Sequence, residues 1–209
     1  IQAITDQGLI IEELDHTRTR HFLSAFEKAG DLPHKPDLVL VLVKSYDTEE
    51  AVSSIIHLYP KDCLFLTLQN GIGNLEQIAK HIPFQQILAG ITSQGATLAE
   101  PGIVMHGGNG PTMIGELEGP STARVQEIVD LFTKAGLQAQ PTEHTRQRIW
   151  EKLLVNVGIN ALTALTGIKN GKICKYHSAE ALAVAAVREA REVAQALNII
   201  LPTDMSQKV

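Results

Sequence analysis

The feature that most constrains the fold is an uninterrupted apolar run, LVLVLV, at residues 38–43. A strand without polar alternation is typical of a parallel sheet that is covered on both faces. Further strand-like runs lie at residues 63–68 and 87–91, and helical patterns occupy residues 49–58 and 75–81 between them. Because strands alternate with helices, the sequence predicts a parallel α/β sheet with right-handed crossover connections.

The segments on either side of this unit are less regular. Residues 8–12 fit a short strand, and residues 20–27 fit a short helix or a loop. After the sheet, the expected elements are a loop at 92–101, a hairpin formed by strands 102–106 and 112–115, an amphipathic helix at 122–135 and a last strand at 137–141.

Beyond residue 142 the pattern is helical throughout. Helices are expected at 145–166 and 179–197, and Asp204 fits the start of another. The change from alternating strands and helices to helices alone predicts a domain boundary, which divides the chain into residues 1–142 and 143–209. Clefts between domains are favoured positions for ligand sites, so we expect the site there.

The first helix of the second part carries one polar line on an otherwise apolar surface. Lys152, Asn156 and Asn160 are spaced four residues apart, which stacks their side chains on one face. The apolar residues around them predict that the helix is largely buried. Polar side chains in such a place either bond neighbouring backbone groups or form a site that protonates and orients a small polar ligand.

Two further candidates lie just after predicted strands. Lys44 and Asn70 each follow the carboxyl end of a buried strand, where open α/β sheets bind their ligands. The alternatives are a solvated strand end for Lys44 and a turn residue for Asn70. Gly71 and Gly73 would allow a close approach of the backbone to a ligand, but the third glycine position of a dinucleotide fingerprint holds Glu76.

Composition excludes several functional classes. The net charge of -5 and an aromatic fraction of 4% argue against binding to nucleic acid. No apolar run is long enough to span a bilayer, and no membrane association is expected. Cys63 and Cys174 lie far apart and form no metal-binding pattern, so we expect no metal, a buried Cys63 and a reducing cytoplasm. His106 has no partner acid at a recognisable spacing and is expected to be structural.

Several segments together resemble the ketopantoate reductase family. They are VKSYDT at residues 43–48, QNGIGN at 69–74, residues 106–115, the Lys-x3-Asn-x3-Asn helix at 150–165, and Asn-Gly at 170–171. Their order and spacing match along nearly the whole chain. The helix with its lysine and two asparagines, after an Asn-Gly-x-Gly turn, is the most specific combination.

The resemblance implies an α/β fold, a Rossmann-type NADP-binding domain followed by an all-helical substrate domain. It also implies NADPH-dependent reduction of 2-dehydropantoate to pantoate, in pantothenate and coenzyme A biosynthesis. By the same resemblance, Lys152 is the general acid and Asn70, Asn156, Asn160 and Asn170 bind the substrate. Lys44, Asn70 and Ala96 are implied as cofactor contacts, with NADP(H) as the cofactor and a small 2-oxo acid as the substrate.

The chain departs from the family pattern at both ends. The glycine-rich phosphate loop would precede Ile1, and a late serine and glutamate would follow Val209. We therefore expect an interior piece of a longer enzyme, which by itself binds dinucleotide weakly because the helix N-terminus that holds the pyrophosphate is absent.

Other functions remain open at this point. One is a related 2-oxo or 3-hydroxy acid dehydrogenase, or an opine-type dehydrogenase, on the same two-domain plan. Another is a truncated paralogue that only binds or dimerises, and a third is a lysine Schiff-base enzyme. The sequence leaves the oligomeric state open, with a homodimer among the alternatives.

Overall fold

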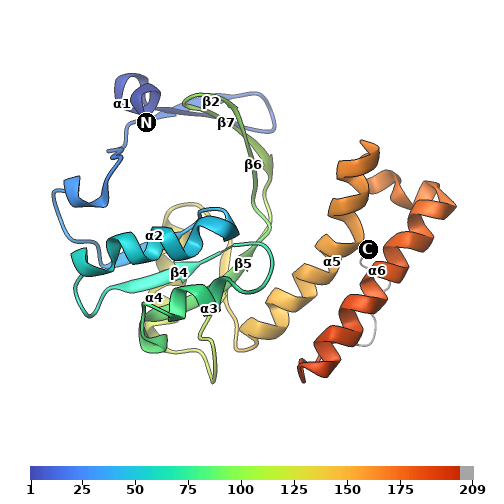
Figure 1. Cartoon of the computed structure of the whole chain (residues 1–209). Coiled ribbons are helices and arrows are strands. Elements are labelled where there is room, and N and C mark those ends of the chain that lie inside the picture. Colours follow the sequence, from blue (N-terminus) through green and yellow to red (C-terminus); the bar gives the residue numbers. More distant parts are fainter. Residues whose placement is uncertain (203–209) are drawn as a thin grey trace.

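The structure is a computed structural model that describes residues 1–202. The described residues form two sheets, shorter helices beside them and a pair of long helices (Figure 1). The helices are α1 (Gln2–Gln7), α2 (Thr48–Ile55), α3 (Asn74–Ala79), α4 (Ala123–Lys134), α5 (Thr145–Thr166) and α6 (His177–Ala196). The strands are β1 (Leu9–Glu12), β2 (Arg18–His21), β3 (Leu38–Val41), β4 (Leu64–Thr67), β5 (Ile87–Thr92), β6 (Gly95–Glu100), β7 (Ile103–Gly108), β8 (Thr112–Gly115) and β9 (Ala139–Pro141).

The larger sheet has the order β3-β4-β5-β8-β9. β3, β4 and β5 are parallel, which confirms the predicted α/β unit. β8 runs antiparallel to β5 and parallel to β9, so the sheet is mixed beyond the predicted part. Successive residues of β4 point to opposite faces: Phe65 packs with the buried residues of α2 and α3, and Leu66 packs with those of α4. Cys63 belongs to the first of these clusters, as expected.

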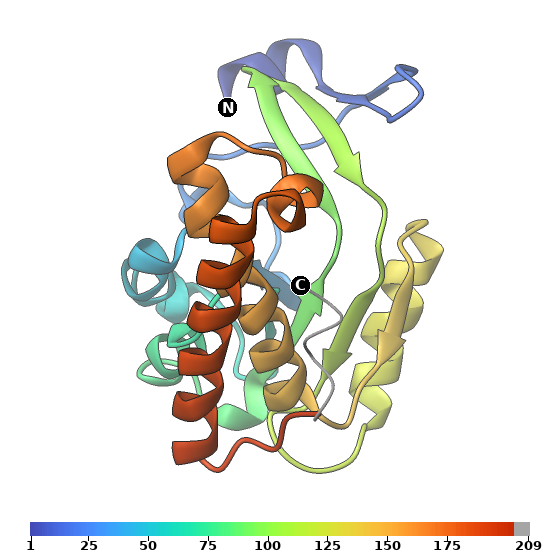
Figure 2. The same ribbon diagram turned by 90° about the vertical axis from the view of Figure 1, so that its right-hand side faces the viewer.

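The smaller sheet has the order β2-β1-β7-β6 and was not expected. The predicted hairpin of strands 102–106 and 112–115 is wrong, because β7 pairs with β1 and β6 whereas β8 pairs with β5 and β9. The predicted loop at 92–101 is also wrong, because most of it forms β6. Figure 2 shows β6 and β7 as curved strands of the smaller sheet that extend away from the larger one.

The structure shows which regular elements the N-terminal segment forms, which its sequence left open. The strand expected at residues 8–12 is β1, and residues 18–21 form β2, antiparallel to it. The segment expected as a helix or loop at 20–27 therefore begins as strand and continues without regular structure.

The two long helices follow the sheets and lie side by side (Figures 1 and 2). α5 has the predicted bounds, and it ends at Gly167, whose φ of 69° is in the left-handed region that glycine favours. The prediction that this helix is largely buried holds only for its first half. Leu154 is fully buried, whereas Leu165 is 86% exposed. The helix expected at Asp204 lies outside the described residues, and the domain boundary at residue 142 stays a prediction.

Candidate functional site

The carboxyl ends of the three parallel strands lie together at one edge of the larger sheet. β3 leads to Lys44, β4 leads to Gln69 and Asn70, and β5 ends at Thr92. Gln69 joins two of these ends, because its side-chain amide donates to the Val43 carbonyl at 2.6 Å. Gln69 was not among the predicted site residues; its role depends on a contact between positions 26 residues apart.

The turn after β4 is open toward solvent. Gly71 and Gly73 have φ of 93° and 90°, and a Cβ at either position would meet no heavy atom within 4 Å. Asn70 is exposed, and its backbone carbonyl accepts a hydrogen bond from the side chain of the buried Asn74 at 3.5 Å. The hydrogen bond from Asn74 therefore holds the turn in place, while the Asn70 side chain and the glycine backbone remain accessible.

Lys152 projects from α5 toward this edge of the sheet. Its Nζ donates to the backbone carbonyl of Thr92, the last residue of β5, at 2.6 Å. Burial lowers the pKa of Lys152, because removal from water disfavours the charged ammonium. Lys152 and Asn70 line one small pocket, whose other residues include Leu68, Ile91 and Ile149. The structure thus brings together two of the predicted site residues.

The other predicted residues lie farther along α5 or outside the small pocket. Asn156 is half-buried and Asn160 is exposed, one and two turns after Lys152. Asn170 is exposed at the start of a 3-10 helix, Asn170–Lys175. Lys44 is exposed after β3, and Ala96 lies on β6 opposite His106. Within residues 1–202, none of these five residues lines the pocket that Lys152 and Asn70 share.

A larger cavity of about 400 Å³ lies on the other side of the same turn. Its lining residues include Thr67, Gly73, Asn74, Trp150 and Leu197. Lys152 and Asn70 do not line this cavity, so we do not choose the candidate site by cavity size. We place the candidate site beside the smaller pocket, whose volume of about 10 Å³ is about that of one water, where a partly buried ammonium adjoins the open turn.

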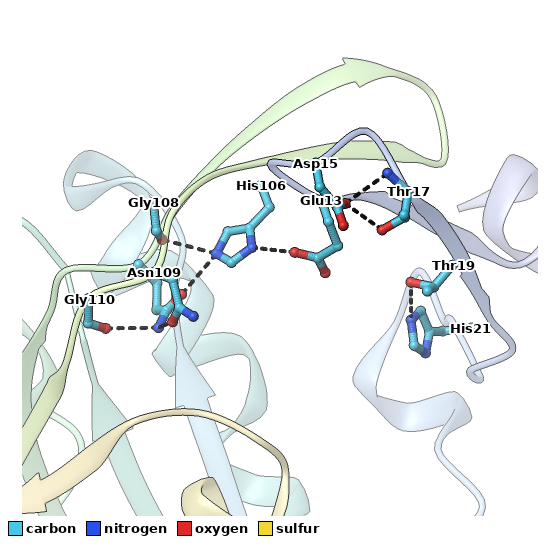
Figure 3. Close-up of polar contacts among 10 residues, drawn as sticks. Glu13, Asp15, Thr17, Thr19, His21, His106, Gly108, Asn109 and Gly110 are labelled. Atoms are coloured by element: carbon cyan, nitrogen blue, oxygen red, sulfur yellow. Dashed lines mark hydrogen bonds and ion pairs between the residues drawn. The ribbon is translucent and has the colours of Figure 1, made fainter.

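His106 has a partner acid that the sequence did not reveal. Its Nδ1 lies 2.7 Å from a carboxylate oxygen of Glu13, which is 93 residues away in the chain (Figure 3). The sequence shows no partner acid at a recognisable spacing, and the fold brings Glu13 to His106 from a distant segment. The structural role of His106 stays a prediction. No local spacing could have revealed this pair, because it depends on the pairing of β1 with β7.

Within residues 1–202, no group of three or more His, Cys, Asp or Glu side chains could hold a metal ion. None of the helices in this part of the chain combines the length and the hydropathy that crossing a bilayer requires.

Comparison with known proteins gives matches along nearly the whole chain. The family model described as ketopantoate reductase PanE/ApbA matches residues 1–119, and the model of the corresponding C-terminal part matches residues 144–209. The 2-dehydropantoate 2-reductase of Halobacterium salinarum is 42% identical over 199 residues, which cover 94% of this chain and 64% of the relative. The chain therefore spans less than two thirds of the length of that curated relative.

Solved structures have the same fold. A D-mandelate dehydrogenase in a ternary structure with NADH and anilino(oxo)acetate matches with a TM-score of 0.89 and 26% identity, over 99% of this chain and 66% of that one. A PanE/ApbA family ketopantoate reductase from Ralstonia eutropha matches with a TM-score of 0.85 and 29% identity, over 100% of this chain and 67% of that one.

Proposed function

The chain belongs to the ketopantoate reductase family, and we propose that it carries the catalytic lysine of an NADPH-dependent 2-dehydropantoate 2-reductase. The reaction reduces the 2-oxo group of 2-dehydropantoate to the hydroxyl group of pantoate, a step of pantothenate biosynthesis. The observation that carries the proposal is the position of the Lys152 ammonium, which a carbonyl at the end of β5 holds beside the Asn70 turn.

Lys152 acts in this proposal as the general acid. As negative charge develops on the carbonyl oxygen of the substrate, a nearby ammonium stabilises that charge and donates its proton. Burial lowers the pKa of Lys152, which makes its ammonium a stronger acid than one in water. The Thr92 carbonyl occupies one of the three N–H donors, so the remaining two can face the substrate.

Asparagine side chains orient the substrate in this proposal. Asn156 and Asn160 extend the face of α5 that carries Lys152, and their amides can donate to the carboxylate and hydroxyl groups of a small 2-oxo acid. We assign Asn170, which follows α5, to the same function. Asn70 stands on the other wall of the pocket, where it can contact both the substrate and the cofactor.

The residues present fit one end of a dinucleotide. A Cβ at Gly71 or Gly73 would meet nothing within 4 Å, so the turn leaves space for a planar ring against its backbone. We assign Lys44 and Ala96, together with Asn70, to cofactor contacts. NADPH supplies the hydride when it is bound. No residue of this chain is assigned to the pyrophosphate, because the two glycines are not a complete fingerprint.

We extend the proposal to the organisation of the protein. Residues 1–142 form the cofactor domain and residues 143–209 form the substrate domain, with the pocket of Lys152 between them. A homodimer is proposed as the assembly, which sedimentation would test. The cytoplasm is proposed as the location, because both cysteines, Cys63 and Cys174, are free thiols and the reaction consumes a reduced nucleotide.

A second candidate rests on the similarity to D-mandelate dehydrogenase. On this alternative, the same lysine serves an NAD-dependent dehydrogenase of an aromatic 2-hydroxy acid. Purified protein from the complete reading frame would be assayed with 2-dehydropantoate and with benzoylformate, each with NADPH and with NADH. Preference for 2-dehydropantoate and NADPH supports the first function. Preference for benzoylformate and NADH supports the second, and a folded protein inactive with all four pairs would contradict both functions.

A further inference from the structure

Within residues 1–202 the chain passes between its two sheets after β2, after β5 and after β7, and the last two of these crossings lie against each other. One leaves β5 through Ser93 and Gln94, and the other returns from β7 to β8 through residues 109–111. The side-chain amide of Gln94 donates to the Asn109 side chain at 3.0 Å and to the Gly110 carbonyl at 2.8 Å. Gln94 therefore holds the two crossings together.

We call the contact between residues 93–94 and 109–111 the junction. His106, on β7 of the smaller sheet, also bonds to it. Its Nε2 lies 3.1 Å from Oε1 of Gln94 and 3.0 Å from the Gly108 carbonyl, and its Nδ1 lies 2.7 Å from Glu13 (Figure 3). The Gly110 carbonyl fixes the orientation of the Gln94 amide, because only the amide nitrogen can donate to it.

Within residues 1–202, the partners of the His106 ring are a carboxylate, an amide oxygen and a backbone carbonyl. Because these groups accept hydrogen bonds, their arrangement favours an imidazolium, in which both ring nitrogens donate. The hydrogen bond and the charge of Glu13 raise the pKa of His106, which agrees with this geometry, and the Gly108 carbonyl adds to the effect.

Hydrogen bonds through Thr92 connect the junction to Lys152. The backbone N–H of Gln94 donates to the Thr92 hydroxyl at 3.2 Å, and that hydroxyl also bonds the Thr112 hydroxyl at 2.8 Å. The carbonyl of the same Thr92 accepts from Lys152 at 2.6 Å. A fixed Gln94 thus fixes the residue that orients the ammonium.

We propose that His106, held as a cation by Glu13, is a positioning residue that acts through Gln94 and Thr92 to orient the ammonium of Lys152. The inference rests on the catalytic role proposed for Lys152. Among the charged groups of the neighbouring segments, Glu12 of β1 pairs with Arg18 and His16, and Asp15 accepts from Thr17 within its own turn. The facing residues of β6, Gly95 to Thr97, carry no charge.

Loss of the imidazolium should act on Lys152 in a defined direction. A mobile Thr92 carbonyl stabilises the ammonium less, so the pKa of Lys152 falls further and the alkaline limb of the kcat profile moves to lower pH. We expect kcat at neutral pH to fall about tenfold, with little change in KM, because a displaced acid weakens the transition state more than substrate binding.

Two variants test the proposal, each with a matched control. His106→Gln removes the cation, and Glu13→Gln keeps a side chain of similar size but removes the charge that holds it. The controls are His21→Gln, whose imidazole bonds only Thr19 in its own strand, and Asp15→Asn, whose contacts remain within its turn. The pH dependence of kcat is measured beside trace acetylation of Lys152 with acetic anhydride, which reports the pKa of its amino group without any assay of activity.

The proposal predicts that both test variants lower the pKa from acetylation and move the alkaline limb, while both controls match the wild type. An unchanged acetylation curve in a folded Glu13→Gln protein would overturn it, even if His106→Gln does not fold. If Lys152→Ala keeps normal turnover, the proposed function fails; the acetylation curves still decide whether the junction positions Lys152.

Discussion

Lys152 combines a cost in stability with the chemical use that we propose for it. Burial lowers its pKa, which means that the ammonium is less stable in the folded protein than in water. The fold compensates with one hydrogen bond to the Thr92 carbonyl. This cost supports the proposed assignment of Lys152 to the site, because a lysine with no function in this position could be replaced by an apolar side chain.

The lowered pKa makes a prediction about stability and pH. Between the pKa of Lys152 in the folded protein and its usual value of 10.5, the unfolded chain binds more protons, so this residue makes the free energy of unfolding rise with pH. Lys152→Met lacks this contribution. Its stability relative to the wild type should therefore be greatest near pH 7 and decrease toward pH 10.5 in urea titrations. A difference that does not vary with pH would contradict the assignment of a buried ammonium.

Asn70 and Asn74 should separate function from stability. Asn70 has an exposed side chain, so Asn70→Ala should reduce turnover and change the free energy of unfolding by about 0.5 kcal/mol or less. Asn74 is buried and bonds the Thr48 hydroxyl, so Asn74→Ala should cost about 1–3 kcal/mol. Thermal unfolding and steady-state kinetics on both variants check this. Normal turnover in Asn70→Ala would make Asn70 a turn residue only.

At the scale of residues, sequence reasoning identified the polar line on α5 because side chains four apart on a helix share a face. It could not identify Thr92 as the partner of Lys152, since the two are 60 residues apart. The contacts of Gln69 and the Glu13–His106 pair could not be predicted for the same reason. Local periodicity contains no information on which distant backbone carbonyl or carboxylate will lie nearby.

At the scale of elements, α5 has two halves with different environments. Its first half packs on β5 and on α6, and Leu154 is fully buried beside Val187. Its second half exposes Leu165. The apolar pattern predicted the bounds of the helix correctly, but it could not predict burial, because burial depends on which elements pack against each face.

Leu154 and Leu165 provide a paired test of this division. Leu154→Ala should lower the free energy of unfolding by about 2–5 kcal/mol, because the substitution leaves a cavity between α5 and α6. Leu165→Ala removes the same atoms from an exposed position and should change it by about 0.5 kcal/mol or less. Chemical denaturation of both variants measures the difference; equal losses would show that both positions are buried in solution.

The incorrect hairpin prediction shows that local sequence patterns do not determine which strands pair. Two strand-like runs on either side of the glycine-rich residues 107–111 are a strong local signal for a hairpin. β7 instead pairs with β1 and β6, which come earlier in the chain. The three parallel strands were predictable because their apolar runs and intervening helices leave few alternatives, whereas β6 carries exposed side chains and no such pattern.

At the scale of the whole molecule, the packing of the two sheets relative to each other depends on the junction between them. A Cβ on Gly110 would overlap the Cβ of Ser93 on the neighbouring crossing. Gly110→Ala should therefore force the crossings apart and cost about 1–3 kcal/mol. Gly30→Ala is the control, since a Cβ there meets nothing within 4 Å and Gly30 is not in the left-handed region. Equal unfolding midpoints for the two variants would show that the junction is not tightly packed.

The position of Lys152 on α5, with its ammonium at the carboxyl end of β5, is the basis of the proposed function. The most direct measurement is turnover of NADPH with 2-dehydropantoate by the protein from its complete reading frame, beside Lys152→Ala and the exposed control Lys134→Ala. We expect Lys152→Ala to lower kcat by about two orders of magnitude or more, the usual size of a general-acid contribution, and Lys134→Ala to leave it unchanged. Turnover in Lys152→Ala equal to that of the wild type would contradict the assignment of Lys152 as the acid.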